Sequence, residues 1–154
     1  MANDTAPHAG IMDEAAPELG VTQWIGPSGQ PLAAYGLDKM PGAYKLIFCF
    51  QDACPGCHLT GFPALAQLVQ TFRGSSFISF AAVQTVFEDF ESNTFERMVA
   101  AQSKYALPIP FGHDAGEGRG GAGSALLQRY RNGGTPRFLL IDPAGVVIYN
   151  HSPV

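Results

Sequence analysis

Two continuous apolar runs on either side of a segment with helical spacing constrain the fold of this chain most. The runs cover residues 44–50 and 77–83, and neither alternates between apolar and polar residues. Such runs are typical of strands that are buried on both faces of a parallel or mixed sheet. Between them, apolar residues recur at helical spacing from Cys57 to about Phe72, and Pro63 predicts a kink in that helix.

The remaining segments continue the alternation of strands and helices and end in a hairpin. The further elements predicted are an N-terminal hairpin of residues 23–25 and 30–33, a helix from 93 to 105 capped by Asn93 with Glu96, an extended segment 107–113, a mobile glycine-rich loop 112–123, a short helix 124–131, and closing strands 137–142 and 146–151. This order predicts an α/β sandwich with a central mixed sheet flanked by helices.

Length and composition fit one compact domain. The chain has 154 residues, of which 46% are hydrophobic and 14% are charged, so it can build one ample core but not two. Residues 1–15 are rich in Ala, Pro and Gly without a convincing period, and they are expected to form an extended lead-in. The folded domain is therefore expected to comprise residues 16–154.

Charge and hydropathy exclude several classes of partner. Nine Lys and Arg residues against 13 Asp and Glu residues give a net charge of −4, and the nine cations are scattered. Without a basic stripe, nucleic acid is not an expected partner. The apolar runs are far shorter than the roughly 18 residues that span a bilayer. The first residues have no basic or apolar signal region, which favours the cytoplasm, or the periplasm if a signal segment was removed.

The most informative motif is Cys54-Pro55-Gly56-Cys57, which lies where a buried strand ends and a helix begins. This spacing brings two sulfurs to disulfide distance, while unpaired backbone N–H groups and the helix dipole lower the pKa of a thiolate there. Pro55 suits a first helical turn because its missing N–H would be unpaired, and Gly56 leaves room for a partner to reach the sulfur. The motif therefore indicates dithiol chemistry.

The chain resembles the thioredoxin superfamily, in particular the redoxin branch that includes TlpA-like thiol oxidoreductases and peroxiredoxins. The resemblance covers about residues 16–151. It is carried by residues 16–19, the strand 46–50, the Cys-Pro-Gly-Cys turn, Gly134-Thr135-Pro136, and residues 137–142 followed by Gly145. It implies a thioredoxin-like three-layer sandwich with an N-terminal hairpin extension.

The resemblance also implies a function and a set of site residues. Pro136 would be a cis proline packed against a Cys54–Cys57 disulfide, and the backbone of Thr135 would bind an extended substrate strand. Cys54 would be the exposed nucleophile, and Cys57 would resolve the mixed disulfide by thiol-disulfide exchange. The expected partner is a protein disulfide or dithiol. No metal, flavin or nucleotide is expected, because no phosphate-cradling glycine motif follows a strand.

Three positions depart from the family pattern. Phe48 stands where thioredoxins carry a buried acid, Thr60 where TlpA-like proteins often carry Glu, and Ala53 where a tryptophan usually precedes the first cysteine. A familiar proton carrier is therefore missing. His58 would stabilise a thiolate when protonated, or alternatively faces solvent.

A second interpretation is peroxide chemistry. Pro63 follows Cys57 by six residues, as in the peroxidatic loop of redoxin-type peroxiredoxins, and Arg137 stands where some of them carry an activating arginine. Cys57 would then attack the peroxide. Against this, Cys54 replaces the threonine of that motif, and Phe50 replaces a proline, so dithiol exchange is preferred.

Other interpretations of the same residues are weaker. Cys54, Cys57 and His58 also match a c-type haem attachment pattern, and with His113 they would form a zinc or copper site. His113 is more simply a strand end. Cys49 is expected to be an inert core thiol rather than a third redox cysteine. The acidic stretch 88–91 is expected to be a solvated loop, or to favour basic partners if it lies near the active site. A binding module without turnover is disfavoured because both cysteines and the Thr-Pro pair are intact.

Overall fold

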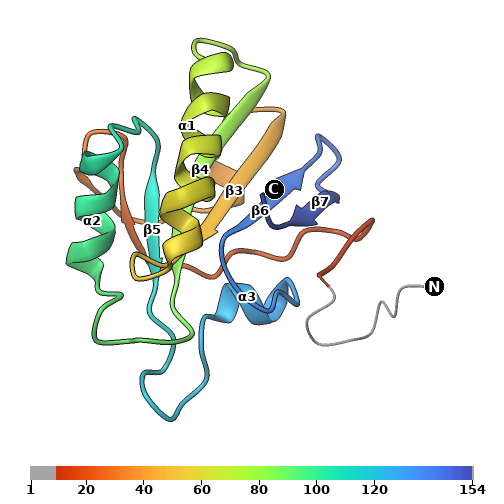
Figure 1. Cartoon of the computed structure of the whole chain (residues 1–154). Coiled ribbons are helices and arrows are strands. Elements are labelled where there is room, and N and C mark those ends of the chain that lie inside the picture. The colour runs from red at the N-terminus through yellow and green to blue at the C-terminus, as the bar shows by residue number, and fades with distance from the viewer. Residues whose placement is uncertain (1–9, 154) are drawn as a thin grey trace.

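The computed structural model describes residues 10–153 and forms one mixed, seven-stranded sheet in the order β2-β1-β5-β4-β3-β6-β7 (Figure 1). The strands are β1 (Gln23–Ile25), β2 (Pro31–Leu32), β3 (Tyr44–Phe50), β4 (Ile78–Thr85), β5 (Phe111–Asp114), β6 (Arg137–Ile141) and β7 (Val147–His151). Strands β3, β4 and β5 are parallel, and β6 runs antiparallel to β3. The predicted buried strands are thus the centre of the sheet.

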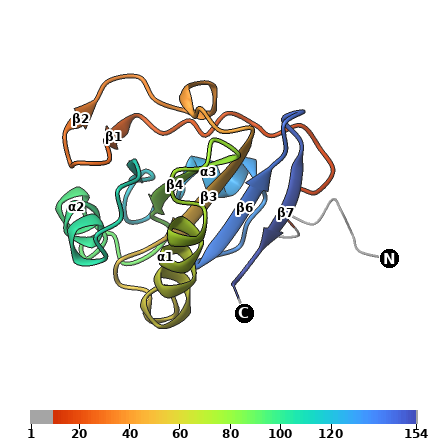
Figure 2. The same ribbon diagram turned by 90° about the horizontal axis from the view of Figure 1, so that it is seen from above.

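Helices cover both faces of the sheet. They are a π-helical turn η2 (Cys57–Gly61), α1 (Phe62–Thr71), α2 (Phe95–Lys104) and α3 (Ala125–Arg129), with a short 3₁₀ turn η1 (Leu37–Lys39). Side chains of α1 and α2 pack on one face of the sheet, and Figure 2 shows both helices on that side. Side chains of α3 pack on the other face, together with the N-terminal segment. The predicted three-layer α/β sandwich is confirmed.

The first helix is irregular just before Pro63. The backbone N–H of Phe62 donates to the carbonyl of Cys57, five residues earlier, so one extra residue is accommodated in the turn. Pro63 has no N–H to donate to the carbonyl of Leu59, which removes one α-helical bond at this point. The disruption predicted at Pro63 therefore takes the form of a π-helical turn that begins at Cys57.

Both predicted hairpins are present. Trp24 of β1 pairs with Leu32 of β2, and β6 pairs antiparallel with β7. Strand β1 also pairs with β5, which joins the N-terminal hairpin to the central sheet. A methyl group on Gly112 of β5 would lie 3.0 Å from the Trp24 ring, so the close approach of these two strands leaves little room for a side chain there.

Two local predictions were wrong. Thr94, not Asn93, caps α2, because its hydroxyl accepts the N–H of Arg97 while the Asn93 side chain is engaged elsewhere. The glycine-rich loop begins after Asp114 rather than at residue 112, because Gly112 belongs to β5.

Part of the predicted N-terminal lead-in is packed against the domain. Its residues 1–9 lie outside the described part of the chain, whereas residues 10–15 contact the domain. The N–H of Ile11 donates to the carbonyl of Tyr130, and its side chain is buried. The boundary at residue 16 stays a prediction. Within residues 10–153, no helix is long and apolar enough to cross a membrane.

Candidate active site

The Cys-Pro-Gly-Cys turn joins the end of β3 to the start of the first helix, and the structure describes both cysteines as free thiols. Cys54 is half-buried, whereas Cys57 has no exposed surface. The two sulfurs therefore differ in access: a partner molecule can reach Cys54 but not Cys57.

The Cys54 sulfur is held by backbone groups on both sides. The N–H of Cys57 donates to it across 3.3 Å, and the thiol itself faces the carbonyl of Thr135 at 3.7 Å. An N–H group at a helix start is the kind of donor that stabilises a thiolate. The geometry thus suits Cys54 as a nucleophile.

Cys57 is in the opposite situation. Burial raises the pKa of its thiol well above the ordinary value, and a hydrogen bond with the Cys54 sulfur raises it further. Cys57 belongs to the core cluster that α1 and α2 cover, which also contains Phe48 and Phe62. Burial of Cys57 therefore favours the protonated form of its thiol.

Pro136 lies against the turn, as the resemblance implies. The Thr135-Pro136 peptide bond is cis. A methyl group on Gly56 would lie 3.5 Å from Pro136 Cδ, and one on Gly61 would lie 3.1 Å from Pro136 Cβ. The structure thus brings Thr135 and Pro136 together with the two cysteines.

Three buried amide side chains, which the sequence prediction missed, hold the loop before Cys54. Gln84 accepts the N–H of Asp52 across 2.8 Å, and Asn93 accepts the N–H of Ala53 across 2.9 Å. Gln51 accepts the N–H of Phe87 across 3.0 Å. The sequence did indicate two of them, because Gln51 and Gln84 are the polar residues that directly follow the apolar runs 44–50 and 77–83.

The His58 side chain is partly buried and forms hydrogen bonds with Asp52 and Tyr105. Within the described residues, it forms no hydrogen bond with a sulfur. Its Nε2 lies 2.6 Å from the carbonyl of Asp52, which can only accept, so Nε2 carries the proton. Its Nδ1 then accepts from the hydroxyl of Tyr105. The Asp52 carboxylate pairs with Arg97 at 3.2 Å. His58 therefore ties the residues before and after the Cys-Pro-Gly-Cys turn to each other.

Arg137 lies apart from the candidate site. Its guanidinium donates to the side chain and the carbonyl of Asn150 at 2.9 and 2.8 Å. Burial lowers its pKa, and its charge acts on Cys49, with which it pairs across β3 and β6. The arginine that peroxide chemistry would place beside Cys57 is thus turned to the other face of the sheet.

Cys49 and His113 also occupy the interior. Cys49 has no exposed surface, and burial raises the pKa of its thiol, as expected of an inert core cysteine. His113 lies in β5, as predicted, and its Nδ1 is 3.2 Å from the amide nitrogen of Gln84. Among residues 10–153, no three His, Cys, Asp or Glu side chains are placed to hold a metal ion.

The fold and the site together define a thioredoxin-like protein with a dithiol turn. A crystal structure of a thioredoxin-like superfamily protein is 34% identical, covering 91% of this chain and 86% of that chain, with a TM-score of 0.76. The chain belongs to the thioredoxin-like superfamily.

Two further solved structures share the fold. A thiol-disulfide isomerase from Corynebacterium glutamicum is 21% identical over 97% of this chain and 88% of its own, with a TM-score of 0.68. A thiol-disulfide oxidoreductase from Bacteroides fragilis is 16% identical over 90% of each chain, with a TM-score of 0.64. No protein-family model and no curated protein matches the chain.

Proposed function

We propose that this chain is a thiol-disulfide oxidoreductase that exchanges its Cys54–Cys57 dithiol with disulfides of partner proteins. The observation that carries the proposal is the contrast between the two thiols: Cys54 is accessible and accepts a backbone N–H, whereas Cys57 is buried with a raised pKa. Solved structures with the same fold include proteins named as thiol-disulfide oxidoreductases.

The reaction proceeds in two exchanges. The Cys54 thiolate attacks one sulfur of the partner disulfide, a bond forms between these two sulfurs, and the second partner sulfur leaves as a thiolate. Cys57 then gives its proton to the partner thiolate and attacks the Cys54 sulfur, which releases the first partner sulfur as a thiolate. The protein dithiol becomes a disulfide, and the partner disulfide receives two electrons. No cofactor beyond the disulfide is part of this proposal.

Thr135 and Pro136 dock the partner. The Thr135 carbonyl already faces the Cys54 sulfur, so an extended partner segment beside it is within reach of the nucleophile. Among residues 10–153, Arg137 is not placed to activate Cys57 toward peroxide, since its guanidinium bonds to Asn150.

The proposal is tested with reduced wild-type protein, Cys54→Ser and Cys57→Ser. Wild type should reduce the disulfides of insulin, Cys54→Ser should be inactive, and Cys57→Ser should accumulate a mixed disulfide that mass spectrometry detects. Oxidation by hydrogen peroxide that survives in Cys54→Ser and vanishes in Cys57→Ser, without insulin reduction by wild type, would overturn the proposal and make Cys57 a peroxidatic cysteine.

A further inference from the structure

One side-chain hydrogen bond closes the chain segment that contains both cysteines of the turn. His58 Nε2 donates to the carbonyl of Asp52 across 2.6 Å, so residues 52–58 form a closed loop. The N–H of Asp52 is held from the other side, because it donates to Gln84 of β4 across 2.8 Å. Asp52 is therefore attached to the sheet through its N–H and to the start of the first helix through its carbonyl.

The direction of the His58 side chain depends on the π-helical turn η2, to which this residue belongs. One extra residue in a helical turn rotates the residues before it by about 100° relative to an unbroken α-helix. Pro63 favours the irregular turn, because it has no N–H for the α-helical bond to Leu59. In an unbroken helix the His58 side chain would point in a different direction from the one that reaches Asp52.

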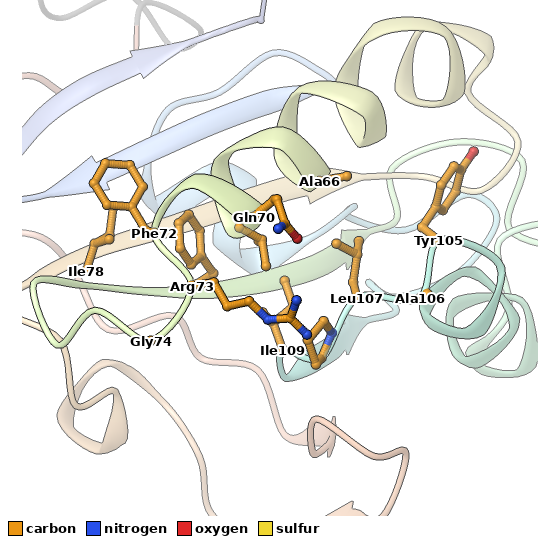
Figure 3. A pocket seen from close by; sticks show the side chains of 13 residues that line it. Ala66, Gln70, Phe72, Arg73, Gly74, Ile78, Tyr105, Ala106, Leu107 and Ile109 are labelled. Carbon is orange, nitrogen blue, oxygen red and sulfur yellow. The ribbon is translucent and has the colours of Figure 1, made fainter.

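Tyr105, the residue that follows α2, fixes which ring nitrogen of His58 carries the proton. In the neutral imidazole, Nδ1 accepts from the hydroxyl of Tyr105, so Nε2 is the nitrogen that donates. The Tyr105 ring is itself held by stacking on Phe62, with a centroid distance of 4.2 Å. Figure 3 shows Tyr105 at one end of a pocket of about 380 Å³, with its hydroxyl directed away from the other labelled side chains.

The two hydrogen bonds of His58 need no charge on the imidazole. Charged groups near the ring are the Asp52 carboxylate, at 3.5 Å from Nε2, and Arg97, which pairs with the other oxygen of that carboxylate at 3.2 Å. Lys104 lies over the Tyr105 ring at 5.3 Å from its centroid. The carboxylate thus already has a cationic partner, and a neutral His58 completes the arrangement.

The Cys54 sulfur depends on where this segment lies relative to the helix start. The N–H of Cys57 is 3.1 Å from the carbonyl oxygen of Cys54 and 3.3 Å from its sulfur. Because these two acceptors share one donor, a small displacement of Cys54 changes how much of the hydrogen bond reaches the sulfur. This N–H is a group that stabilises the Cys54 thiolate, so the position of Cys54 affects its reactivity.

We propose that His58 is a positioning residue for Cys54, and that it acts as a neutral hydrogen-bond donor to the Asp52 carbonyl rather than through an imidazolium charge. The inference rests on the proposed function, in which Cys54 is the nucleophile. Without this bond, the segment before Cys54 is no longer attached to the helix start, and the Cys57 N–H stabilises the Cys54 thiolate less. The reduced protein alone is affected, because a disulfide sulfur carries no charge.

The experiment measures alkylation of Cys54 by iodoacetamide between pH 5 and 8 in wild type, His58→Gln and His58→Leu. Cys49 and Cys57 have no exposed surface, so Cys54 is the thiol that reacts. A hydrogen bond to a charged group is worth about tenfold or more in an equilibrium, and His58→Leu loses part of one, so its rate should fall about three- to tenfold. The equilibrium with glutathione should shift toward the protein disulfide by a similar factor.

His58→Gln separates the hydrogen bond from the charge. The glutamine amide has an N–H that can donate to the Asp52 carbonyl, but it takes up no proton in this pH range. It should therefore keep the wild-type rate and the wild-type pH profile. If His58→Gln is as slow as His58→Leu, the imidazolium charge acts on Cys54 and the inference is overturned.

Tyr105→Phe keeps the stacked ring and removes only the hydroxyl. The His58 imidazole can then also carry its proton on Nδ1, a form in which Nε2 cannot donate, so the alkylation rate should fall to a value between wild type and His58→Leu. This variant decides alone if His58→Leu does not fold. Wild-type rates in Tyr105→Phe and in any folded His58→Leu would overturn the inference.

Thr60→Val is the matched control in the same helical turn. The Thr60 hydroxyl donates to the carbonyl of Gly56 across 3.0 Å, and both residues follow Cys54, so the segment before the nucleophile is not involved. The alkylation rate should stay at the wild-type value. The proposed function is tested separately with wild type: if glutathione disulfide does not form the Cys54–Cys57 disulfide, that function fails, whereas the comparison of alkylation rates still decides the role of His58.

Discussion

Replacing Gln84 by leucine would detach the loop before Cys54 from β4. Gln84 has no exposed surface; its oxygen accepts the N–H of Asp52 at 2.8 Å, and its nitrogen donates to the carbonyl of Thr94 at 2.9 Å. Leucine has a similar size but no polar atom, so these two backbone groups lose their partners. At about 1–3 kcal/mol for each buried group left unpaired, the free energy of unfolding should fall by about 2–6 kcal/mol.

The same change should alter the reactivity of Cys54, the proposed nucleophile. Alkylation by iodoacetamide needs the Cys54 thiolate, and the N–H groups that stabilise the thiolate depend on the geometry of the turn. We expect the alkylation rate of Cys54 at pH 7 to fall several-fold in Gln84→Leu, while urea denaturation reports the loss of stability.

Gln102→Leu is the matched control for this substitution. Gln102 is also buried, and its side-chain nitrogen donates to the carbonyls of Gly26 and Ile109, both at 2.9 Å. It should lower stability by a comparable amount and leave Cys54 alkylation unchanged. An equal change of rate in both variants, or none in Gln84→Leu, would refute the idea that Gln84 positions the loop.

Three further predictions concern stability. Burial raises the pKa of Cys49 and Cys57, so above about pH 8.5 the unfolded chain loses these protons while the native state keeps them. In urea titrations, the free energy of unfolding should therefore fall by up to about 1.4 kcal/mol per pH unit for each thiol. Cys49→Ala should remove about half of that slope, and an unchanged slope would contradict the argument. Burial lowers the pKa of His113, so below about pH 6.5 the unfolded chain takes up a proton before the native state does. Thermal melts should therefore show the stability of wild type falling as the pH drops from 7 to 5, and falling less in His113→Gln. The same pH dependence of stability in both proteins would contradict this. Gly61→Ala puts a methyl group 2.6 Å from the buried Phe48 ring and should lower the free energy of unfolding by about 1–3 kcal/mol in urea denaturation. Higher stability, as the better helix propensity of alanine alone would give, would contradict this prediction.

The sequence predicted the elements whose signals are local. Strands β3 and β4 are buried on both faces, so their apolar runs are unbroken and easily recognised. The closing hairpin was equally clear, because Pro143-Ala144-Gly145 separates two apolar segments. The structure closes this turn with a bond from the N–H of Gly145 to the carbonyl of Asp142. The cysteine turn could be placed because it lies at such a junction of strand and helix.

What could not be predicted depends on groups that are distant in the chain. Asn93 and Thr94 are both good caps for α2, and local sequence does not choose between them. The choice follows from the N–H of Ala53, which is 40 residues away and needs the Asn93 oxygen. The position of Arg137 has a similar origin, because its partner, Asn150, is brought beside it only when β6 and β7 pair.

Because the familiar proton carrier is missing, the pKa of Cys57 depends on its burial and on the state of the Cys54 sulfur. With Phe48 in place of an acid, the pKa of Cys57 is raised by burial and, next, by the hydrogen bond and the negative charge of Cys54. The contribution of Cys54 disappears once that sulfur is joined to the partner, because a disulfide sulfur carries no charge. In the proposed reaction, Cys57 would therefore lose its proton more readily after the mixed disulfide has formed, which is the stage at which it attacks.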